Sequence, residues 1–312
     1  MSLSKSIARK LLGGRAIWRK RNDAKARTDQ LSRELEEERH TTAALQKEIE
    51  QLRNPPKPFK TVSLMGRQMK IFGRHGDSYF DNLDEAHTNN FLAFAASRLD
   101  RNSAVAFDVG SNIGLIASTL SGACKEVHSF EPSPTTQPFL MQTLAANGAS
   151  NVTVNKVAVA AEKGELRFFD DYNSTSASHV ITGDTLGRIS EVVVPVTTID
   201  AYTDEKKINR LDFMKIDIEG FEIDALRGGE NTIKTLKPSV LVEFNSFTMI
   251  GFRNVNPREL LDYLRGLFPH LYKWEGGQPV ELKTDGDALG FIHNNLVHHG
   301  CVDDLLGTFA PV

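Results

Sequence analysis

Beyond residue 104, short apolar segments alternate with longer segments in which apolar residues recur every three or four positions. The short segments predict strands, and the longer ones predict helices. The predicted strands are residues 105–109, 126–130, 152–159, 211–218, 240–244, 271–274 and 290–297. The predicted helices are residues 113–121, 134–147, 257–267 and one that begins near residue 221. This alternation predicts an α/β fold, a doubly wound and mostly parallel sheet with helices on both faces.

Two further apolar segments, residues 166–169 and 192–196, flank a polar loop of residues 170–188. We expect the two segments to form a hairpin-like pair beside the main series of strands. The loop contains the polar sequence NSTSASH, which ends at His179. A loop of this kind is placed to fold over a cleft as a lid.

A different pattern occupies residues 23–54, where positions 28, 31, 35, 38, 42, 45, 49 and 52 follow alternating steps of three and four. Five of these eight positions are Leu or Ile, and charged residues fill many of the positions between them. The heptad predicts a coiled-coil helix that self-associates into a homo-oligomer through residues 28–52, with a single solvated helix as the alternative. Prolines then predict a stiff spacer of residues 55–60, followed by one domain of residues 61–312.

Residues 1–22 hold seven Lys and Arg side chains and no Asp or Glu. Ile7, Leu11 and Trp18 recur among them at steps of four and seven, which is typical of a basic amphipathic helix. Such a leader favours peripheral contact with an anionic membrane through residues 5–21. A solvated terminus or a cleaved transit peptide explains the same composition.

The composition, 40% apolar and 25% charged over 312 residues, is that of a globular protein, and no segment has the roughly 18 apolar residues of a membrane span. The net charge of −3 divides into the basic leader and an acidic remainder of −10, which disfavours nucleic-acid binding by the body. Cys124 and Cys301 fit no disulfide or zinc pattern, and no signal-peptide apolar segment follows the basic start. We expect a cytoplasmic protein, with peripheral contact at the inner membrane face as the alternative.

The first predicted strand runs into the turn FDVGSNIG, residues 107–114. This turn departs from the dinucleotide fingerprint GxGxxG, because Asp108 stands at the first glycine position and Gly114 comes one residue late. A carboxylate here repels a pyrophosphate but favours a ligand that carries an ammonium and a sulfonium group. Gly110 still allows close approach of a ligand to the backbone, and Gly114 still allows the helix to pack near the strand.

Glu131 follows the second predicted strand, 23 residues after Asp108. An acid at about this distance is typical of a carboxylate that accepts hydrogen bonds from a ribose diol, and a loop-capping role is the alternative. Val157 and Ala158, in the third predicted strand, are expected beside an adenine ring. Ordinary strand burial explains those two residues equally well.

The sequence KIDIEGFE, residues 215–222, brings ionisable groups to the end of the fourth predicted strand. Strand periodicity puts Lys215, Asp217 and Glu219 on one side, where burial without a function is costly. An ion pair and acids at a helix start are the alternative interpretation. Because Glu243 ends the adjacent strand, Asp217 and Glu243 are expected to share a proton, a hydroxyl substrate or a divalent metal.

The segments FDVGSNIG (107–114), FEPSP (130–134) and DFMKIDIEGFEIDALRGGE (212–230) together resemble the FkbM-type methyltransferases, S-adenosylmethionine-dependent enzymes with a Rossmann-like fold. The resemblance covers roughly residues 105–297. It implies a seven-stranded sheet whose last strand is antiparallel, and O-methylation of a sugar, glycan or secondary metabolite. With the positional assignments above, the expected cofactor site comprises Asp108, Gly110, Ser111, Asn112, Gly114, Glu131, Pro132, Val157, Ala158 and Asp217.

Methyl transfer to an alcohol requires alignment of donor and acceptor and removal of a proton. We expect Asp217 or Glu243 as the base, with Lys215 tuning the carboxylates and His179 as a further candidate. A divalent metal held by Asp217, Glu243 and Asn245 is less favoured, and no metal site is assigned. The alternative functions are an NAD(P)-dependent oxidoreductase and a catalytically silent scaffold oligomerised by its coiled coil.

Overall fold

The computed structural model describes residues 59–84, 89–171, 175, 178–180 and 191–312, together with seven helical positions between 27 and 42. The chain divides into two units, Met1–Lys57 and Pro58–Val312. All the strands that the structure describes belong to the second unit.

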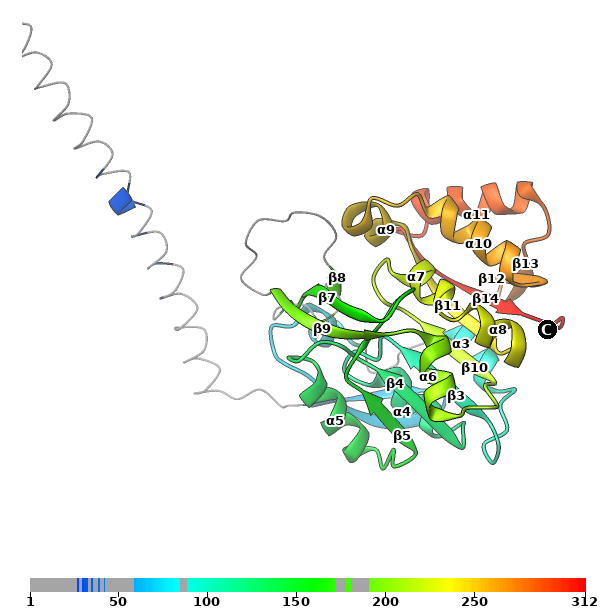
Figure 1. Cartoon of the computed structure of the whole chain (residues 1–312), viewed down its shortest axis with the longest axis horizontal. Helices are drawn as coiled ribbons and strands as arrows, with labels where there is room; N and C mark the ends of the chain where they lie inside the picture. The colour runs from blue at the N-terminus through cyan, green and yellow to red at the C-terminus, as the bar shows by residue number, and fades with distance from the viewer. Residues whose placement is uncertain are drawn as a thin grey trace, which may run out of the picture. The chain divides into compact units, whose positions relative to one another are not determined.

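The second unit is built around an eight-stranded sheet of order β13-β12-β14-β11-β10-β3-β4-β5 (Figure 1). Its strands are β3 (Val105–Val109), β4 (Glu126–Phe130), β5 (Val152–Asn155), β10 (Phe213–Ile216), β11 (Ser239–Asn245), β12 (His270–Glu275), β13 (Gln278–Glu281) and β14 (Val302–Thr308). The strands from β11 to β5 are parallel, whereas β14 is antiparallel to β11, β12 to β14, and β13 to β12. The mostly parallel sheet and its antiparallel last strand are confirmed. The sheet has one strand more than the seven expected, because the chain turns at Gly276 and Gly277 and adds β13 at the edge.

Helices cover both faces of this sheet, as its side chains show. Successive strand residues point to opposite faces, so Phe107 and Val242 enter one core and Ala106 and Leu241 enter the other. The first core is shared with α7 and α10, and the second with α3 and α4. The helices of the second unit are α2 (Ser78–Asp81), α3 (Asn90–Ala96), α4 (Leu115–Ser121), α5 (Gln137–Ala146), α6 (Ile199–Lys206), α7 (Glu222–Arg227), α8 (Glu230–Leu236), α9 (Ser246–Arg253), α10 (Pro257–Leu267) and α11 (Asp285–Val297).

A second sheet has the order β6-β9-β7-β8. Its strands are β6 (Ala158–Val159), β7 (Gly164–Phe169), β8 (His179–Val180) and β9 (Glu191–Thr197). The antiparallel pairing of β7 with β9 confirms the predicted hairpin-like pair. The single strand predicted over residues 152–159 is wrong, because the chain changes sheets between β5 and β6.

Residues 290–297, predicted as a strand, are the second half of helix α11. Thr284 and Asp287 form a reciprocal capping box that starts this helix. Ala288, Phe291 and Asn295 are then buried at helical spacing on one side. The apolar residues of this segment resemble a strand only when the capping signal before them is ignored.

The second unit begins with an antiparallel hairpin of β1 (Phe59–Leu64) and β2 (Arg67–Phe72). Phe59 pairs in register with Phe72, and their ring centroids lie 5.5 Å apart. Phe59 and Lys60 therefore belong to a strand and not to the predicted spacer. The sequence pattern did not predict this hairpin, whose Val62 and Met69 are buried in the second core.

The predicted leader of residues 1–22 lies outside the described residues, as do most positions of the heptad. The seven described positions between 27 and 42 are all helical. Leu31 and Leu35, which belong to the predicted seam, are 56% and 53% exposed in the single chain. Self-association through this segment stays a prediction. Among the helices that the structure describes, none is both long and apolar enough to cross a membrane.

Candidate active site

The turn after β3 brings three strand ends together. Gly110 adopts a positive φ of 90°, and a Cβ there would lie 1.7 Å from the carbonyl oxygen of Asp217. The backbone N–H groups of Gly110 and Ser111 both donate to the carbonyl oxygen of Phe130 at 3.0 Å. Only glycine satisfies this close approach and this backbone conformation together, so the turn requires Gly110.

Glu131, directly after β4, is fixed by two backbone donors. The N–H of Asn112 donates to its Oε2 at 2.8 Å, and the N–H of Ser133 donates to its Oε1 at 2.8 Å. Burial raises the pKa of Glu131 to about 7 in spite of these hydrogen bonds. Each carboxylate oxygen keeps a further lone pair, which suits two hydroxyl donors of a ribose.

Asp108 and Gly114 support the turn and do not line the pocket. Asp108 is 1% exposed, and neither of its carboxylate oxygens is satisfied by a described donor at hydrogen-bond geometry. Burial raises the pKa of Asp108 to about 7, although Ser111 and Lys215 nearby oppose that increase. An unsatisfied acid directly below the turn favours a cationic group in the pocket above.

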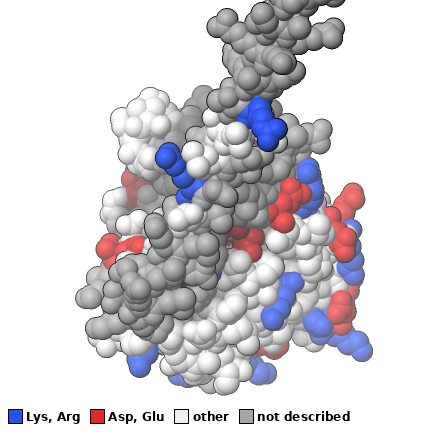
Figure 2. All heavy atoms as spheres, turned by 90° about the vertical axis from the view of Figure 1, so that its left-hand side faces the viewer, with Lys and Arg blue, Asp and Glu red and all other residues white. Residues whose placement is uncertain are grey.

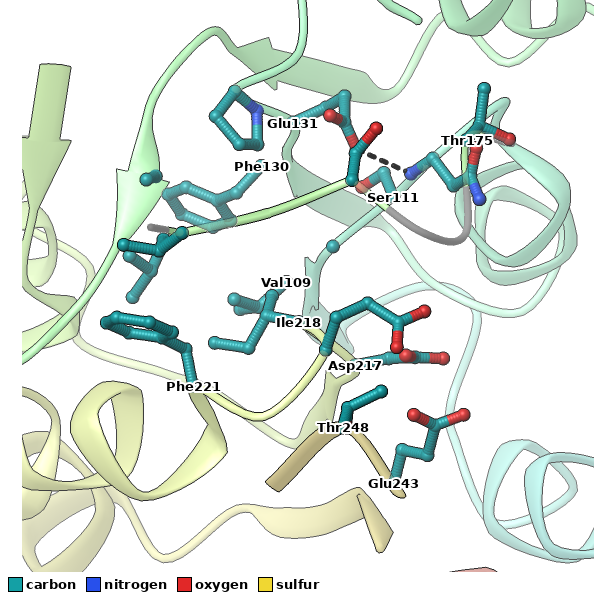
Figure 3. Close-up of a pocket in the computed structure, with 18 of the residues that line it drawn as sticks. Val109, Ser111, Phe130, Glu131, Thr175, Asp217, Ile218, Phe221, Glu243 and Thr248 are labelled. Carbon is teal, nitrogen blue, oxygen red and sulfur yellow. Dashed lines mark hydrogen bonds between the residues drawn. The ribbon is translucent and has the colours of Figure 1, made fainter. Parts of the chain in front are cut away.

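These strand ends open into a cavity of about 460 Å³. Its apolar part includes Val109, Phe130, Ile218 and Phe221, and its acidic part includes Asp217 and Glu243 (Figure 3). Other predicted cofactor residues also line it, namely Gly110, Ser111, Asn112, Glu131, Pro132, Val157 and Ala158. The structure therefore gathers eight of the ten predicted cofactor residues, all except Asp108 and Gly114, around one cavity at the carboxyl ends of the parallel strands, where ligands of such sheets bind.

Three carboxylates, Asp217, Glu219 and Glu243, form what we call the acid cluster. One oxygen from each lies within 4.8 Å of the others. Burial, followed by the charge of Asp217, raises the pKa of Glu219 to about 9 and the pKa of Glu243 well above its usual range. Glu222 supports the cluster, since its Oε1 accepts from the N–H groups of Ile218 at 3.0 Å and Gly220 at 3.1 Å. Carboxyl groups with raised pKa values at a cavity wall are candidates for acid–base chemistry.

Lys215 lies beside the cluster and does not line the cavity. Its ammonium group is 3.0 Å from Asp304 and 3.5 Å from Asp217. Burial alone would lower the pKa of Lys215, but Asp304 and Asp217 together hold it above its usual range. The sequence did not point to Asp304, which reaches the site because β14 pairs Asp304 with Glu243 in register.

The structure does not place His179 in the cavity wall, where Ser178 and Val180 stand instead. His179 is buried in β8, and its ring stacks on Phe252 with centroids 4.0 Å apart. Asn245, the predicted third metal ligand, has a different set of contacts. Its side chain donates to Glu243 at 3.4 Å and accepts from the N–H of Thr248, so it positions Glu243 and caps α9.

Residues 77–79, which precede the first predicted strand, also contribute to the site. The sequence pattern did not suggest this contribution. Tyr79 on α2 lines the cavity near Asp217 and Glu243, both of which raise its pKa in addition to burial. Asp77 caps α2 through the N–H groups of Tyr79 and Phe80, and it also accepts from the N–H of Thr175 at 3.3 Å. Thr175 belongs to the predicted lid and lines the cavity. Asp77 therefore connects two walls of the pocket.

Comparison with known proteins gives matches to methyltransferases. A curated relative, the hexuronic acid methyltransferase AglP of Haloferax volcanii, is 23% identical over 142 residues, which are 46% of this chain and 56% of that protein. The chain thus spans just over half the length of that relative. A structure of methyltransferase FkbM from Methylobacillus flagellatus is 19% identical and covers 66% of this chain and 44% of its own, with a TM-score of 0.40. The structure of the O-methyltransferase TomG from Streptomyces achromogenes is 11% identical. The match covers 75% of this chain and 86% of that chain, also with a TM-score of 0.40.

The family match covers most of the residues that form the cavity. The methyltransferase FkbM domain matches residues 108–270, which are more than half of the chain. This range begins at Asp108 and includes Glu131, Asp217 and Glu243. The chain belongs to the FkbM methyltransferase family.

Proposed function

We propose that this protein transfers a methyl group from S-adenosylmethionine to a hydroxyl group of a small-molecule or glycan acceptor. The observation that carries the proposal is one cavity with two functional sides. Figure 3 shows Glu131, suited to a ribose, and Glu243 of the acid cluster on opposite sides of the pocket. This arrangement accommodates a nucleoside at one side and leaves carboxylates for an acceptor at the other.

The residues present fit the cofactor. Glu131 would accept hydrogen bonds from the ribose hydroxyls, while Val157 and Ala158 would border the adenine. The unsatisfied carboxylate of Asp108 favours the cationic methionine end near the turn. When bound, S-adenosylmethionine supplies a methyl group activated by a positively charged sulfur.

The acid cluster supplies the base. An acceptor hydroxyl that forms a new O–C bond must lose its proton, and a carboxylate within reach can take it. We assign this role to Glu243, because Asn245 orients its carboxylate whereas Asp217 is paired with Lys215. The raised pKa makes the ionised form of Glu243 a stronger base than an exposed carboxylate, so turnover should increase as rising pH ionises this group.

Ligand-dependent thermal shifts of the full chain distinguish this function from its alternatives. S-adenosylmethionine and S-adenosylhomocysteine at about 100 times their Kd should each stabilise the protein by about 2.7 kcal/mol. The corresponding rise in Tm is roughly 5–10 °C. Stabilisation by NAD alone would support the oxidoreductase, and stabilisation by none of the three ligands would support the silent scaffold.

A matched pair of variants localises the response. Glu131→Gln should greatly reduce the shift that either ligand produces, because the amide replaces one ribose-accepting oxygen with a donor. Glu165→Gln, at an exposed position on β7, should keep the full shift. Equal shifts in both variants would place the cofactor elsewhere.

A further inference from the structure

We propose that the acceptor is a neutral or amine-bearing sugar, and that the acid cluster excludes sugars that carry a carboxylate. This inference rests on the proposed function, because it concerns the acceptor side of the same cavity. It predicts an order of preference, with amino and neutral sugars above uronates.

The charges that line the cavity are the first argument. Four described lining residues are acidic, namely Glu131, Asp217, Glu219 and Glu243. No Lys, Arg or His occurs among the described lining residues. Lys215, the cation beside the acid cluster, is only 5% exposed and already pairs with Asp304 and Asp217. An acceptor carboxylate would therefore find no cationic partner among the described lining residues.

The spacing of the cluster strengthens this argument. One oxygen from each of its three carboxyl groups lies within 4.8 Å of the others, so the site already holds three acidic groups close together. A carboxylate from the acceptor would add a fourth acidic group at the same place. Hydroxyl and ammonium groups behave oppositely, because they donate hydrogen bonds and carboxylates are acceptors when ionised.

An aromatic surface in the wall of the same cavity is the second argument. Phe247 on α9 lines the cavity and remains 62% exposed. Its ring meets Phe252 edge-on at 5.9 Å, and Phe252 in turn stacks on His179. An exposed ring gives a sugar a flat apolar surface for its C–H face. The neighbouring Thr248 and Tyr79 add hydroxyl groups to the cavity wall.

Together these features match the two sides of a sugar ring. The C–H face can pack on Phe247 while hydroxyls at the ring edge donate to Glu219 and Glu243. A planar aromatic acceptor would use the ring surface but would leave most of the carboxylate oxygens without donors. Because a distant relative is described as a hexuronic acid methyltransferase, discrimination against uronates is the most informative prediction.

The test compares matched methyl glycosides. The full chain is first titrated with S-adenosylhomocysteine, which establishes the cofactor site independently of any acceptor. Labelled methyl transfer is then measured for the methyl glycosides of glucose, galactose and mannose, and for their 2-amino and uronate counterparts. We expect kcat/KM for the best neutral or amino sugar to exceed that for its uronate by about 100-fold or more.

The two levels of the proposal fail in different ways. If S-adenosylhomocysteine does not bind, the proposed function itself is wrong. If it binds and the uronates are methylated as well as or better than the others, or if none of the sugars is methylated, only the acceptor assignment is overturned.

Two variants with matched controls locate the discrimination. Glu219→Lys, which places a cation in the cavity wall, should reduce the preference for the neutral sugar over the uronate at least tenfold, whereas Glu165→Lys on β7 should leave it unchanged. Phe247→Ala should raise the acceptor KM about tenfold, whereas Ile250→Ala, also exposed on α9 but outside the described cavity lining, should not. The Kd of S-adenosylhomocysteine should stay within threefold in all four, which shows that each is folded. An unchanged preference in Glu219→Lys would contradict the charge argument.

Discussion

At the scale of single residues, the site depends on close approach of backbone to backbone. Gly110 faces the carbonyl oxygen of Asp217, so the cofactor turn and the acid cluster share one constraint. Three acids near this turn also have shifted pKa values, because burial raises the pKa of Asp108, Glu131 and Glu219. Burial of several carboxyl groups in one site costs free energy that the rest of the fold must offset. Such perturbed pKa values are common at functional sites.

Gly110→Ala should destabilise the protein far more than Gly148→Ala. Both glycines have positive φ, but a Cβ at Gly148 has nothing within 4 Å, whereas a Cβ at Gly110 overlaps the Asp217 carbonyl. We expect a loss of roughly 3 kcal/mol or more for Gly110→Ala and about 1 kcal/mol for Gly148→Ala. Thermal unfolding should show a Tm lower by roughly 6–12 °C and by about 2–4 °C respectively. Equal losses would mean that the turn adapts to the added methyl group.

Cofactor affinity should depend on pH through Glu131. Its pKa of about 7 in the free protein lies above the usual value, and the ribose requires the ionised form. As the pH falls below 7, binding must expel a proton, so the Kd of S-adenosylhomocysteine should rise by up to about tenfold per pH unit. Above pH 8 the Kd should be constant. The same shift has the opposite effect on the free protein, whose stability from this group is complete below about pH 4.5 and is lost as the pH rises through 7.

Isothermal titration between pH 5.5 and 8.5 measures this dependence. Asp108, with a pKa of about 7, titrates in the same range and adds to the slope. Glu131→Gln should bind more weakly at pH 8 and show a shallower dependence than the wild type. An affinity in the wild type that does not change with pH would show that neither acid contacts the cofactor.

The base assignment predicts a separation of chemistry from binding. Glu243→Gln should lower kcat by about 10²- to 10⁴-fold, because the amide cannot take the hydroxyl proton. The Kd of S-adenosylhomocysteine should change little, since Glu243 lies on the acceptor side. Asp217→Asn provides the comparison with the other predicted base. If both variants retain turnover with cofactor binding intact, a carboxylate base is ruled out.

At the scale of elements, the pocket is completed by pieces distant in sequence. Helix α2 brings Tyr79 to the acid cluster, and Asp77 at its start holds Thr175 of the predicted lid. Asp77 is 1% exposed, so this contact is shielded from water. The hydrogen bonds of Asp77 therefore fix both the lid residue Thr175 and the helix that brings Tyr79 to the acid cluster.

Asp77→Ala should raise the acceptor KM about tenfold through loss of this connection. Thr198→Ala is the control, because Thr198 caps α6 in the same way and does not line the cavity. Each substitution should cost about 1 kcal/mol of stability, which makes the two variants comparable in unfolding experiments. A similar KM in both variants would show that the lid does not depend on Asp77.

The sequence predicted those elements whose local pattern agrees with their place in the fold. The central strands are mostly apolar and lead into the motif residues, so β3, β4 and β10 could be located together with Asp108, Glu131 and Asp217. The segment at 290–297 was misassigned because its apolar residues suit either period. Tyr79 and Asp304 could not be found, because only the packing of α2 and the register of β14 bring them to the acid cluster.

At the scale of the whole molecule, the chain combines two units of different character. The described surface of the second unit is mixed in charge, and Figure 2 shows Lys and Arg interspersed with Asp and Glu on one face. Acidic groups gather around its cavity, where Glu131 and the acid cluster line the wall and Asp108 is buried nearby. The acidic lining of the cavity therefore indicates more about the ligand than the net charge of −3 indicates about binding partners.

Self-association through the first unit is a prediction at this scale. Replacement of both Leu31 and Leu35 by Asp should convert an oligomer to a monomer, because each places a charge in the heptad seam. Ser32→Asp, at an exposed helical position outside the seam, should leave the mass unchanged. Light scattering during gel filtration measures the mass. A monomeric wild type would contradict the coiled-coil prediction.

The central claim is methyl transfer to a hydroxyl group, and the chemical nature of the product tests it most directly. The full chain is incubated with unlabelled S-adenosylmethionine and the glycoside panel, and the product is analysed by mass spectrometry before and after mild alkali. The account predicts a product 14 mass units heavier whose methyl group survives alkali, as an ether does and a carboxylate ester does not. An alkali-labile product, a methyl group on nitrogen, or no transfer would contradict it.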